Sequence, residues 1–251
     1  MLFDRKHGAR GRTIKKTFRP RLEALEDRCL LSGGFRTYDG SGNNLTYAEW
    51  GQAGSLLSRV APAAYADGIS APNGASRPGA REISNAVIAE TEELLNDRSM
   101  SDFIYVFGQM VDHDLDLTIN ASPAQPFNIP VPTGDPFFDP TGTGTQIIPM
   151  NRSKSDPATG TGIGNPRQQV NEVTAWLDGS AIYGSSEARA LALRTLEGGR
   201  LKTSAGNLLP FNTMGLENQN RSPLPAEQLF VAGDIRVNEN IELTAIQTVW
   251  M

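Results

Sequence analysis

The chain has 251 residues, of which 39% are hydrophobic, a fraction that is ordinary for a packed protein. Nine of its 23 Lys and Arg residues lie within residues 1–28 beside four acids, so the remainder holds 14 basic and 24 acidic residues, a net charge of −10. This acidic remainder argues against a nucleic-acid groove. Because no run approaches the roughly 20 apolar residues of a spanning helix, we expect no transmembrane segment.

The basic head, residues 1–33, is predicted to be an export-associated segment. Its basic run leads into Leu22–Ser32, "LEALEDRCLLS", which is amphipathic and lacks the apolar core of an ordinary secretory signal. This stretch resembles the segment that opens many exported multidomain bacterial proteins, and the resemblance implies an extracellular or secreted protein. The alternative is a disordered basic tail of a cytoplasmic protein. Cys29, the sole cysteine, lies here, which argues against thiol chemistry in the rest of the chain.

Residues 34–251 alternate loop-forming and periodic stretches. Gly, Pro, Asn, Asp and Ser crowd three segments, which we expect to be loops: Tyr38–Leu45, Tyr65–Ala80 and Asn120–Arg167. Apolar periodicity predicts three helices: Ser84–Leu95, Asp102–Leu115, and Gln168–Leu177 with an extension from Ser186 to Leu196. No run of alternating strands is present. The pattern predicts one mainly α domain with unusually long loops, which usually carry function.

The helix predicted over Asp102–Leu115 carries the most informative residues. Gln109 and His113 lie one turn apart at i and i+4, and Asp112 sits beside them, so the three side chains project into one shared space. Four apolar residues are expected to face the core: Phe103, Phe107, Met110 and Val111. One interpretation is a working imidazole, and the alternative is a half-buried histidine that a neighbouring acid merely hydrogen-bonds.

Six separated blocks of the sequence resemble the animal-type haem peroxidases, in the peroxidasin-like branch that also occurs in bacteria. These blocks are "YDGSGNNL", "REISN", "FGQMVDHDLDLT", "GDPFFDPTGTGTQIIP", "NEVTAWLDGSAIYGSS" and "LFVAGDIRVNENIELTAIQTVW". Several matches in order are more specific than one motif. The resemblance implies a helical scaffold around haem b that reduces hydrogen peroxide and oxidises a halide or a small organic donor.

The resemblance also assigns catalytic roles. His113 would be the distal histidine, which takes a proton from hydrogen peroxide and delivers it to the leaving oxygen, a role that suits an imidazole. Arg236, in "AGDIRVNE", would face the oxygen atoms as negative charge develops. Gln109 would hydrogen-bond pocket water or a small anionic substrate. Taken without the motif, Arg236 reads as a surface ion-pair partner.

Two carboxylates match the positions that bind the cofactor covalently in the resembled family. Asp112 and Glu239 stand where these enzymes form esters with haem methyl groups, so such links are an expectation. Where mammalian members place a methionine that forms a third link, this chain has Asn240, which excludes that link. The alternative is that Asp112 and Glu239 are helix caps or ion-pair partners.

A second predicted site would bind calcium. Its ligands are Asp114, Thr174, Trp176, Asp178 and Ser180, with Trp176 contributing only its carbonyl oxygen. Spacing of two along "TAWLDGS" lets oxygen donors converge, and oxygen is what a cation needing six to eight ligands requires. Without the resemblance, an ordinary Ser/Thr/Asp-rich turn is the better interpretation.

The resemblance further implies that this chain is the truncated distal half of a peroxidase domain over residues 34–251. The family's proximal histidine lies beyond the helix in which the chain stops at Met251, and the chain has only His7 and His113. The activity would then need a separate proximal-half polypeptide, and the alternative is an inactive secreted remnant or calcium-binding module. Four apolar residues of the last helix are expected to lack packing partners: Leu243, Ile246, Val249 and Trp250.

Overall fold

The computed structural model describes residues 35–74, 76–90, 92–219 and 222–251, so the predicted export segment, with His7 and Cys29, lies outside the described residues. The elements are α1 Ala80–Val87, α2 Phe103–Leu115, β1 Ile129–Pro130, β2 Ile147–Ile148, α3 Ser180–Tyr183, α4 Glu187–Leu193, the 3₁₀ turn η1 Ala226–Gln228 and α5 Ile241–Val249. Most of the regular structure is helical, and long loops connect the elements, in agreement with the predicted class. No helix of the described residues is long and apolar enough to cross a membrane.

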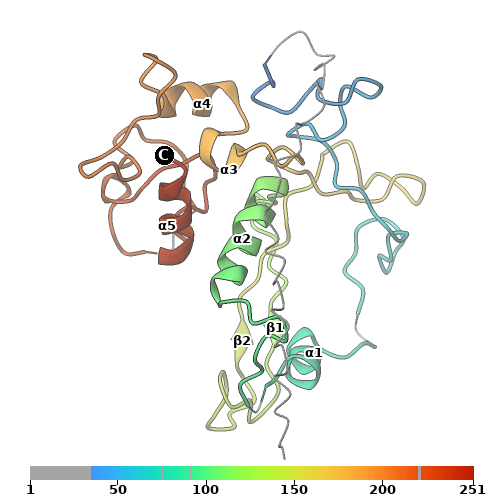
Figure 1. The fold of residues 1–251 in the computed structure, drawn as a ribbon. Helices are drawn as coiled ribbons and strands as arrows, with labels where there is room; N and C mark the ends of the chain where they lie inside the picture. Colours follow the sequence, from blue (N-terminus) through green and yellow to red (C-terminus); the bar gives the residue numbers. More distant parts are fainter. Residues whose placement is uncertain (1–34, 75, 91, 220–221) are drawn as a thin grey trace, which may run out of the picture.

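The central packing joins α2 to α5 and α3, with α4 beside α3 (Figure 1). Val106 and Met110 lie one turn apart on α2 and form its inner stripe. The main cluster of buried apolar residues combines the three helices: Val106, Met110, Ala181, Ile182, Leu243 and Ile246. The expectation that α5 lacks partners is therefore wrong for Leu243 and Ile246, while Val249 and Trp250 are 84% and 55% exposed.

Two helices form where the periodicity predicts them. The prediction over Asp102–Leu115 is confirmed by α2. The expected extension over residues 186–196 is confirmed by the shorter α4, whose N-cap Ser186 accepts a hydrogen bond at Oγ from the backbone N–H of Arg189. The core covers Val106 and Met110 on α2 and Ala190 and Leu193 on α4. The expectation that Phe103 and Phe107 face the core is wrong, because each of these side chains is 51% exposed.

The helix predicted over Ser84–Leu95 is correct only over its first four residues and wrong over residues 88–95. It begins earlier, at Ala80, where the Glu82 carboxylate accepts a hydrogen bond from the Gly79 N–H, and it ends at Val87. Beyond it, Leu94 and Leu95 are 66% and 83% exposed, so no core surface covers the apolar stripe that suggested a longer helix. A helix in water depends on such packing more than on propensity.

The helix predicted over Gln168–Leu177 is wrong. Gln169 and Val170 form antiparallel bridges, to Ser155 and to Leu56, and the residues after them make bends. The Asn171 side chain accepts a hydrogen bond from the Leu117 N–H and donates one to the Leu115 carbonyl, which ties the segment to the end of α2. Partners far away in the sequence thus take the backbone hydrogen bonds that a helix would have formed within the segment.

The long segment Asn120–Arg167 is an ordered arm that includes β1 and β2 (Figure 1). The two strands pair antiparallel, with Ile129 opposite Ile148. In the connection between β1 and β2, the buried Asp135 carboxylate accepts two hydrogen bonds from the Arg81 guanidinium and one from Asn85, which joins the arm to α1. The arm, which the sequence analysis expected to be a loop, is therefore held in part by hydrogen bonds to the Asp135 carboxylate.

Candidate functional site

His113 lies in the last turn of α2 on the buried face that it shares with Val106 and Met110, and it is only 3% exposed. The segment Gly233–Glu239 covers it. Gly233 lies so close to α3 that a β-carbon would overlap the Ser180 carbonyl oxygen, and the backbone N–H of Asp234 donates to the Ala181 carbonyl at 2.8 Å. Only glycine permits this approach, which brings the residues after it over the imidazole.

Two of the predicted residues, Gln109 and His113, converge on a carboxylate oxygen of a third, Glu239. Gln109 Nε2 donates a hydrogen bond to Glu239 Oε2 at 3.1 Å, and His113 Nε2 lies 3.3 Å from the same oxygen. Asn240 Nδ2 donates to Gln109 Oε1 at 2.8 Å and so orients that amide. The Glu239 side chain is 53% exposed, so this group of polar atoms opens to the surface.

Arg236 lies next to this group and is paired with Asp234, which the sequence analysis missed. The guanidinium donates to the Asp234 carboxylate through Nε at 3.0 Å and Nη2 at 2.7 Å, and to the Asp116 carbonyl at 2.7 Å. The Asp234 side chain is fully buried, whereas that of Arg236 is 14% exposed. Arg236 is thus both the ion-pair partner that one interpretation expected and a neighbour of His113.

The surroundings of His113 favour a neutral imidazole. Burial lowers the pKa of His113 below its ordinary value, and the positive charge of Arg236 lowers it further. The carboxylates of Asp234, Glu239 and Asp112 act in the opposite direction, but the net shift of the pKa is downward. The imidazole can therefore accept a proton at neutral pH.

Asp112 and Glu239, the two predicted ester carboxylates, are both exposed near the imidazole. Burial raises the pKa of the neighbouring Asp116 carboxyl, and the negative charge of Asp112 adds to that rise. Nothing in the described residues tests the ester links, which stay a prediction.

The predicted calcium ligands also meet, around the end of α2. Asp114 Oδ2 accepts hydrogen bonds from the N–H groups of Asp178 and Gly179, and Oδ1 accepts from the Ala181 N–H and the Ser180 hydroxyl. Thr174 Oγ1 lies 3.1 Å from Asp178 Oδ2 and 3.2 Å from Ser180 Oγ. The oxygen donors are thus adjacent, and part of their capacity is already used within the protein.

Two features bear on whether this cluster fits a cation. Asp114 and Asp178 are its two carboxylates, and the described residues contain no group of three or more His, Cys, Asp or Glu side chains placed to hold a metal. Arg36 Nη1 lies 3.0 Å from Asp178 Oδ2 and already supplies a positive charge. The all-oxygen donor set suits calcium, and Arg36 would compete with it.

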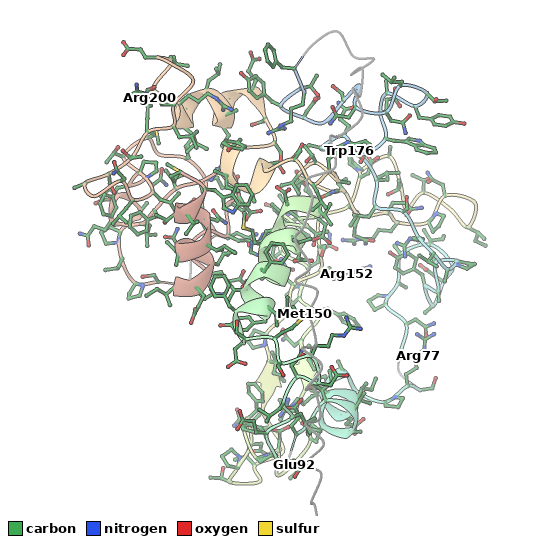
Figure 2. The ribbon with its side chains drawn as sticks, viewed as in Figure 1. Arg77, Glu92, Met150, Arg152, Trp176 and Arg200 are labelled. Carbon is green, nitrogen blue, oxygen red and sulfur yellow. The ribbon has the colours of Figure 1, made fainter. Side chains whose placement is uncertain are left out.

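The Trp176 carbonyl, a predicted calcium ligand, accepts a hydrogen bond from the Asp178 N–H at 2.9 Å. The Trp176 side chain has a separate structural role. Its indole ring packs on the turns at Gly40 and Gly51, both with positive φ, where a β-carbon would overlap the ring. Figure 2 labels Trp176 near the N-terminal part of the described chain. Together with Arg36, the ring fixes the N-terminal segment to the loop Thr174–Ser180.

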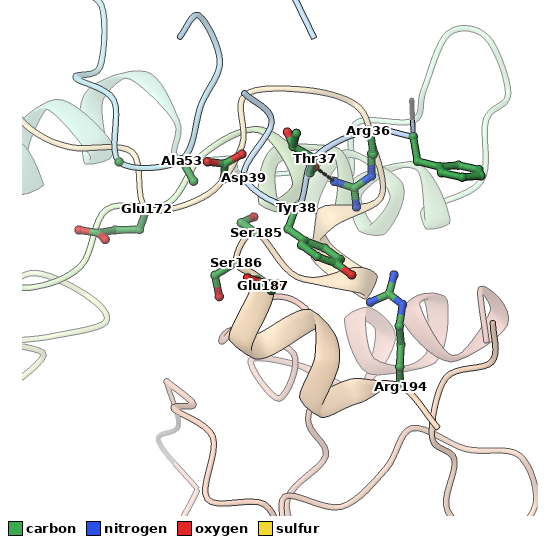
Figure 3. Close-up of a pocket in the computed structure, with 12 residues that line it drawn as sticks. Arg36, Thr37, Tyr38, Asp39, Ala53, Glu172, Ser185, Ser186, Glu187 and Arg194 are labelled. Atoms are coloured by element: carbon green, nitrogen blue, oxygen red, sulfur yellow. Dashed lines mark hydrogen bonds between the residues drawn. The ribbon is translucent and has the colours of Figure 1, made fainter. Parts of the chain in front are cut away.

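A large groove lies elsewhere, between the N-terminal segment of the described residues and α4 (Figure 3). It has a volume of about 1070 Å³ and is lined by both acidic and basic side chains, among them Asp39, Glu187, Arg36 and Arg194. None of the residues predicted for either site lines it. Its size therefore does not make it the site of the predicted chemistry.

The profile of the family described as "Animal haem peroxidase" matches residues 35–251. The chain is 38% identical to Dual oxidase 1 of Caenorhabditis elegans over 213 residues, which is 82% of this chain and 14% of that protein. It is 36% identical to human Dual oxidase 1 over 228 residues, which is 88% of this chain and 15% of that protein. The chain thus spans about a seventh of the length of these relatives.

Solved structures agree with this match. Peroxidase A from Dictyostelium discoideum superposes with a TM-score of 0.74 at 28% identity, over 87% of this chain and 44% of that chain. The fatty acid alpha-dioxygenase of Arabidopsis thaliana gives a TM-score of 0.61 at 19% identity, over 86% of this chain and 30% of that chain. The second likeness concerns the fold alone.

The depressed pKa of His113 predicts a pH dependence of stability. Because the unfolded chain binds the proton at a higher pH than the folded chain, the stabilisation is present above about pH 6.5 and is lost as the pH falls towards the folded pKa. In a His7→Gln background, the urea midpoint should fall between pH 7.5 and 5.5. The additional variant His113→Gln should flatten this decline, and an equal decline in both proteins would contradict the assignment.

Proposed function

The chain belongs to the animal haem peroxidase family, and from this we propose that residues 35–251 form the hydrogen-peroxide side of a haem peroxidase site. The observation that carries the proposal is the convergence of His113 Nε2 and Gln109 Nε2 on Glu239 Oε2, with Arg236 beside them. These side chains come from α2 and from the segment before α5, so the fold itself assembles them. Haem b is the proposed cofactor.

The described residues fit one side of a haem. They offer an unprotonated imidazole, an oriented amide and exposed carboxylates at the surface. His113 is the only histidine among them, so within this part of the chain no second imidazole is present to hold iron. Because the chain spans 44% of the Dictyostelium peroxidase, we propose that the iron ligand comes from further peroxidase sequence, as a separate polypeptide or in a longer chain.

The proposed chemistry divides between haem and protein. Bound haem would supply the iron that takes up hydrogen peroxide and the electrons that break its O–O bond. His113 Nε2 takes the proton from the attacking oxygen and returns it to the leaving oxygen, which a neutral imidazole can do. Arg236 presents positive charge from the neighbouring segment, and Gln109 donates to water or a small anion. A halide or small organic donor is the proposed reductant.

We further propose the finer features that the sequence suggests. These are membership of the peroxidasin-like branch, ester links from Asp112 and Glu239 to haem, and export directed by residues 1–33. The exposure of both carboxylates beside His113 supports the esters, since a bound haem could reach them. The excess of basic residues within residues 1–28 supports export.

A titration with haem tests the central proposal. The purified chain is mixed with haem alone and with the remaining peroxidase sequence, and absorbance then reports a ligated Soret band while a phenolic dye reports peroxide-dependent oxidation. Turnover above that of free haem should require the added sequence. In the complete protein, His113→Ala should lower the rate by about 10²- to 10⁴-fold, the usual worth of a positioned acid–base group.

The matched control for this test is His7→Ala, which removes the other histidine and should leave the rate unchanged. Full peroxidase turnover in His113→Ala would contradict the assigned role. An absence of haem binding under every condition would instead favour the alternative function, an inactive module whose remaining ligand is calcium.

Calcium binding is proposed for the cluster of Asp114, Thr174, Asp178 and Ser180, with the Trp176 carbonyl. Calcium should raise the melting temperature, with a stabilisation of about 2.7 kcal/mol at a concentration 100 times the Kd. Asp178→Ala should abolish the rise, whereas Asp102→Ala, at the exposed N-cap of α2 far along the helix from Asp114, should preserve it. Arg36→Gln should strengthen the response because it removes the competing charge. A melting temperature that calcium leaves unchanged would exclude the site.

A further inference from the structure

We propose that Arg152 and Arg167 form a binding site for a small inorganic oxyanion of the size of phosphate, where the arm meets residues 69–70. The proposal goes beyond the proposed peroxidase function, because neither arginine takes part in that chemistry and both lie outside the predicted calcium cluster. It accounts for two positive charges that no carboxylate of the described residues pairs with.

Both arginines belong to the arm and reach the same short stretch of chain. Arg152, labelled in Figure 2, donates a hydrogen bond from Nη2 to the Ser70 carbonyl at 2.8 Å. The Arg167 backbone N–H donates to the Ile69 carbonyl at 2.8 Å. Arg167 Nη2 donates at 2.6 Å to the carbonyl of Ser153, the residue that follows Arg152. The two arginines therefore lie side by side where the arm meets residues 69–70.

Arg167 is buried without a counter-charge. It is only 6% exposed, its Nη1 donates to Gln125 Oε1 at 2.6 Å, and its Nε is buried with no hydrogen-bond partner in the described structure. None of the ion pairs within the described ranges includes Arg152 or Arg167. Arginine is almost never fully buried unless a negative group pairs with it, so the missing partner calls for an explanation.

The two positive charges repel each other. Burial lowers the pKa of Arg167 below its ordinary value, and the positive charge of Arg152 lowers it further, whereas Tyr65 acts in the opposite direction. An anion close to both guanidiniums would replace this repulsion with two attractions. Such an ion would therefore stabilise the contact between the arm and residues 69–70.

The neighbouring residues add to the positive charge. Arg59 Nη2 donates to the Arg167 carbonyl at 2.7 Å and to the Tyr65 hydroxyl at 3.1 Å, so a third guanidinium lies next to the pair. Asp67, the acidic residue closest in sequence to Ile69, is exposed, and its Oδ1 accepts the backbone N–H groups of residues 69–71. The local excess of positive charge favours an anion.

Arg152 offers the donors that an incoming anion would meet first. It is partly exposed, and in the part of the chain that the structure describes only its Nη2 has a partner, so Nε and Nη1 are free. A guanidinium fork matches two oxygens of one oxyanion, which a spherical halide does not offer. The buried Arg167 would add charge from the inner side. The alternative is a purely structural clamp of carbonyl and amide oxygens, on which added anions have no effect.

Thermal unfolding of the 251-residue chain in inorganic phosphate tests the proposal without haem. Chloride keeps the ionic strength constant, and a chelator removes divalent cations. The melting temperature should rise with phosphate through the millimolar range, because an ion that binds the folded chain stabilises it. Arg152→Gln should weaken the apparent affinity by about tenfold or more, which is about what one hydrogen bond to a charged group contributes. Arg152→Lys, which keeps the charge and loses the fork, should also weaken it.

Arg200→Gln is the matched control. Arg200 is exposed, and Figure 2 places it beyond α4 and distant from Arg152, so this variant should respond to phosphate as the parent chain does. All of these proteins keep the basic residues within residues 1–28, so anion binding there cancels in the comparison.

A melting temperature of the parent chain that phosphate leaves unchanged would overturn the proposal, and this outcome needs no variant. Equal rises in the parent and in a folded Arg152→Gln or Arg152→Lys protein would overturn it too. An equal rise when chloride replaces phosphate at the same ionic strength would contradict an oxyanion site. Haem and peroxide enter none of these measurements, so failure of this proposal and failure of the proposed function are distinguishable.

Discussion

The carboxylate of Asp114 is the interaction on which the arrangement of this protein depends. It extends from the last turn of α2 and accepts four hydrogen bonds, from three backbone N–H groups and the Ser180 hydroxyl at the start of α3. A buried carboxylate is costly to leave unpaired, so each of these bonds constrains the loop that supplies it. The next segment then attaches to α3, with Gly233 N–H donating to Ile182 and Asp234 N–H to Ala181.

This order of attachment explains how groups far apart in the sequence meet. His113 precedes Asp114 on α2, Asp234 is one of the two residues that contact α3, and Arg236 follows two residues later. The loop around Asp178 is therefore joined to His113 through Asp114 on α2, and to the segment over the imidazole through the backbone of α3. If a cation binds beside Asp114, its effect on the proposed peroxidase site follows from the same contacts.

Part of this arrangement can be predicted from the sequence, namely the part that depends on residues close together in the chain. The i, i+4 spacing of Gln109 and His113 follows from helical periodicity, and the spacing of Thr174, Asp178 and Ser180 indicates convergent oxygens. Of the apolar residues expected to face the core, Met110 is buried, whereas Phe103 and Phe107 are exposed. The sequence could not reveal that residues 168–177 are not helical, since the backbone N–H groups of Asn171 and Glu172 bind the carbonyls of Ser55 and Leu117. Asp234 was missed for the same reason: its burial depends on α3 and α2, and only its place two residues before Arg236 gave a signal.

Native-state amide hydrogen exchange in the Asp114→Asn protein tests the account most directly. If this carboxylate holds α2, α3 and the segment over His113 together, the amides of Asp178, Gly179 and Ala181 should lose protection, and those of Gly233 and Asp234 should lose it with them. The amides of the arm around Ile129 and Ile148 serve as the internal reference and should be unchanged. Loss of protection limited to residues 178–181, with Gly233 and Asp234 as protected as before, would contradict the claim that Asp114 positions the site.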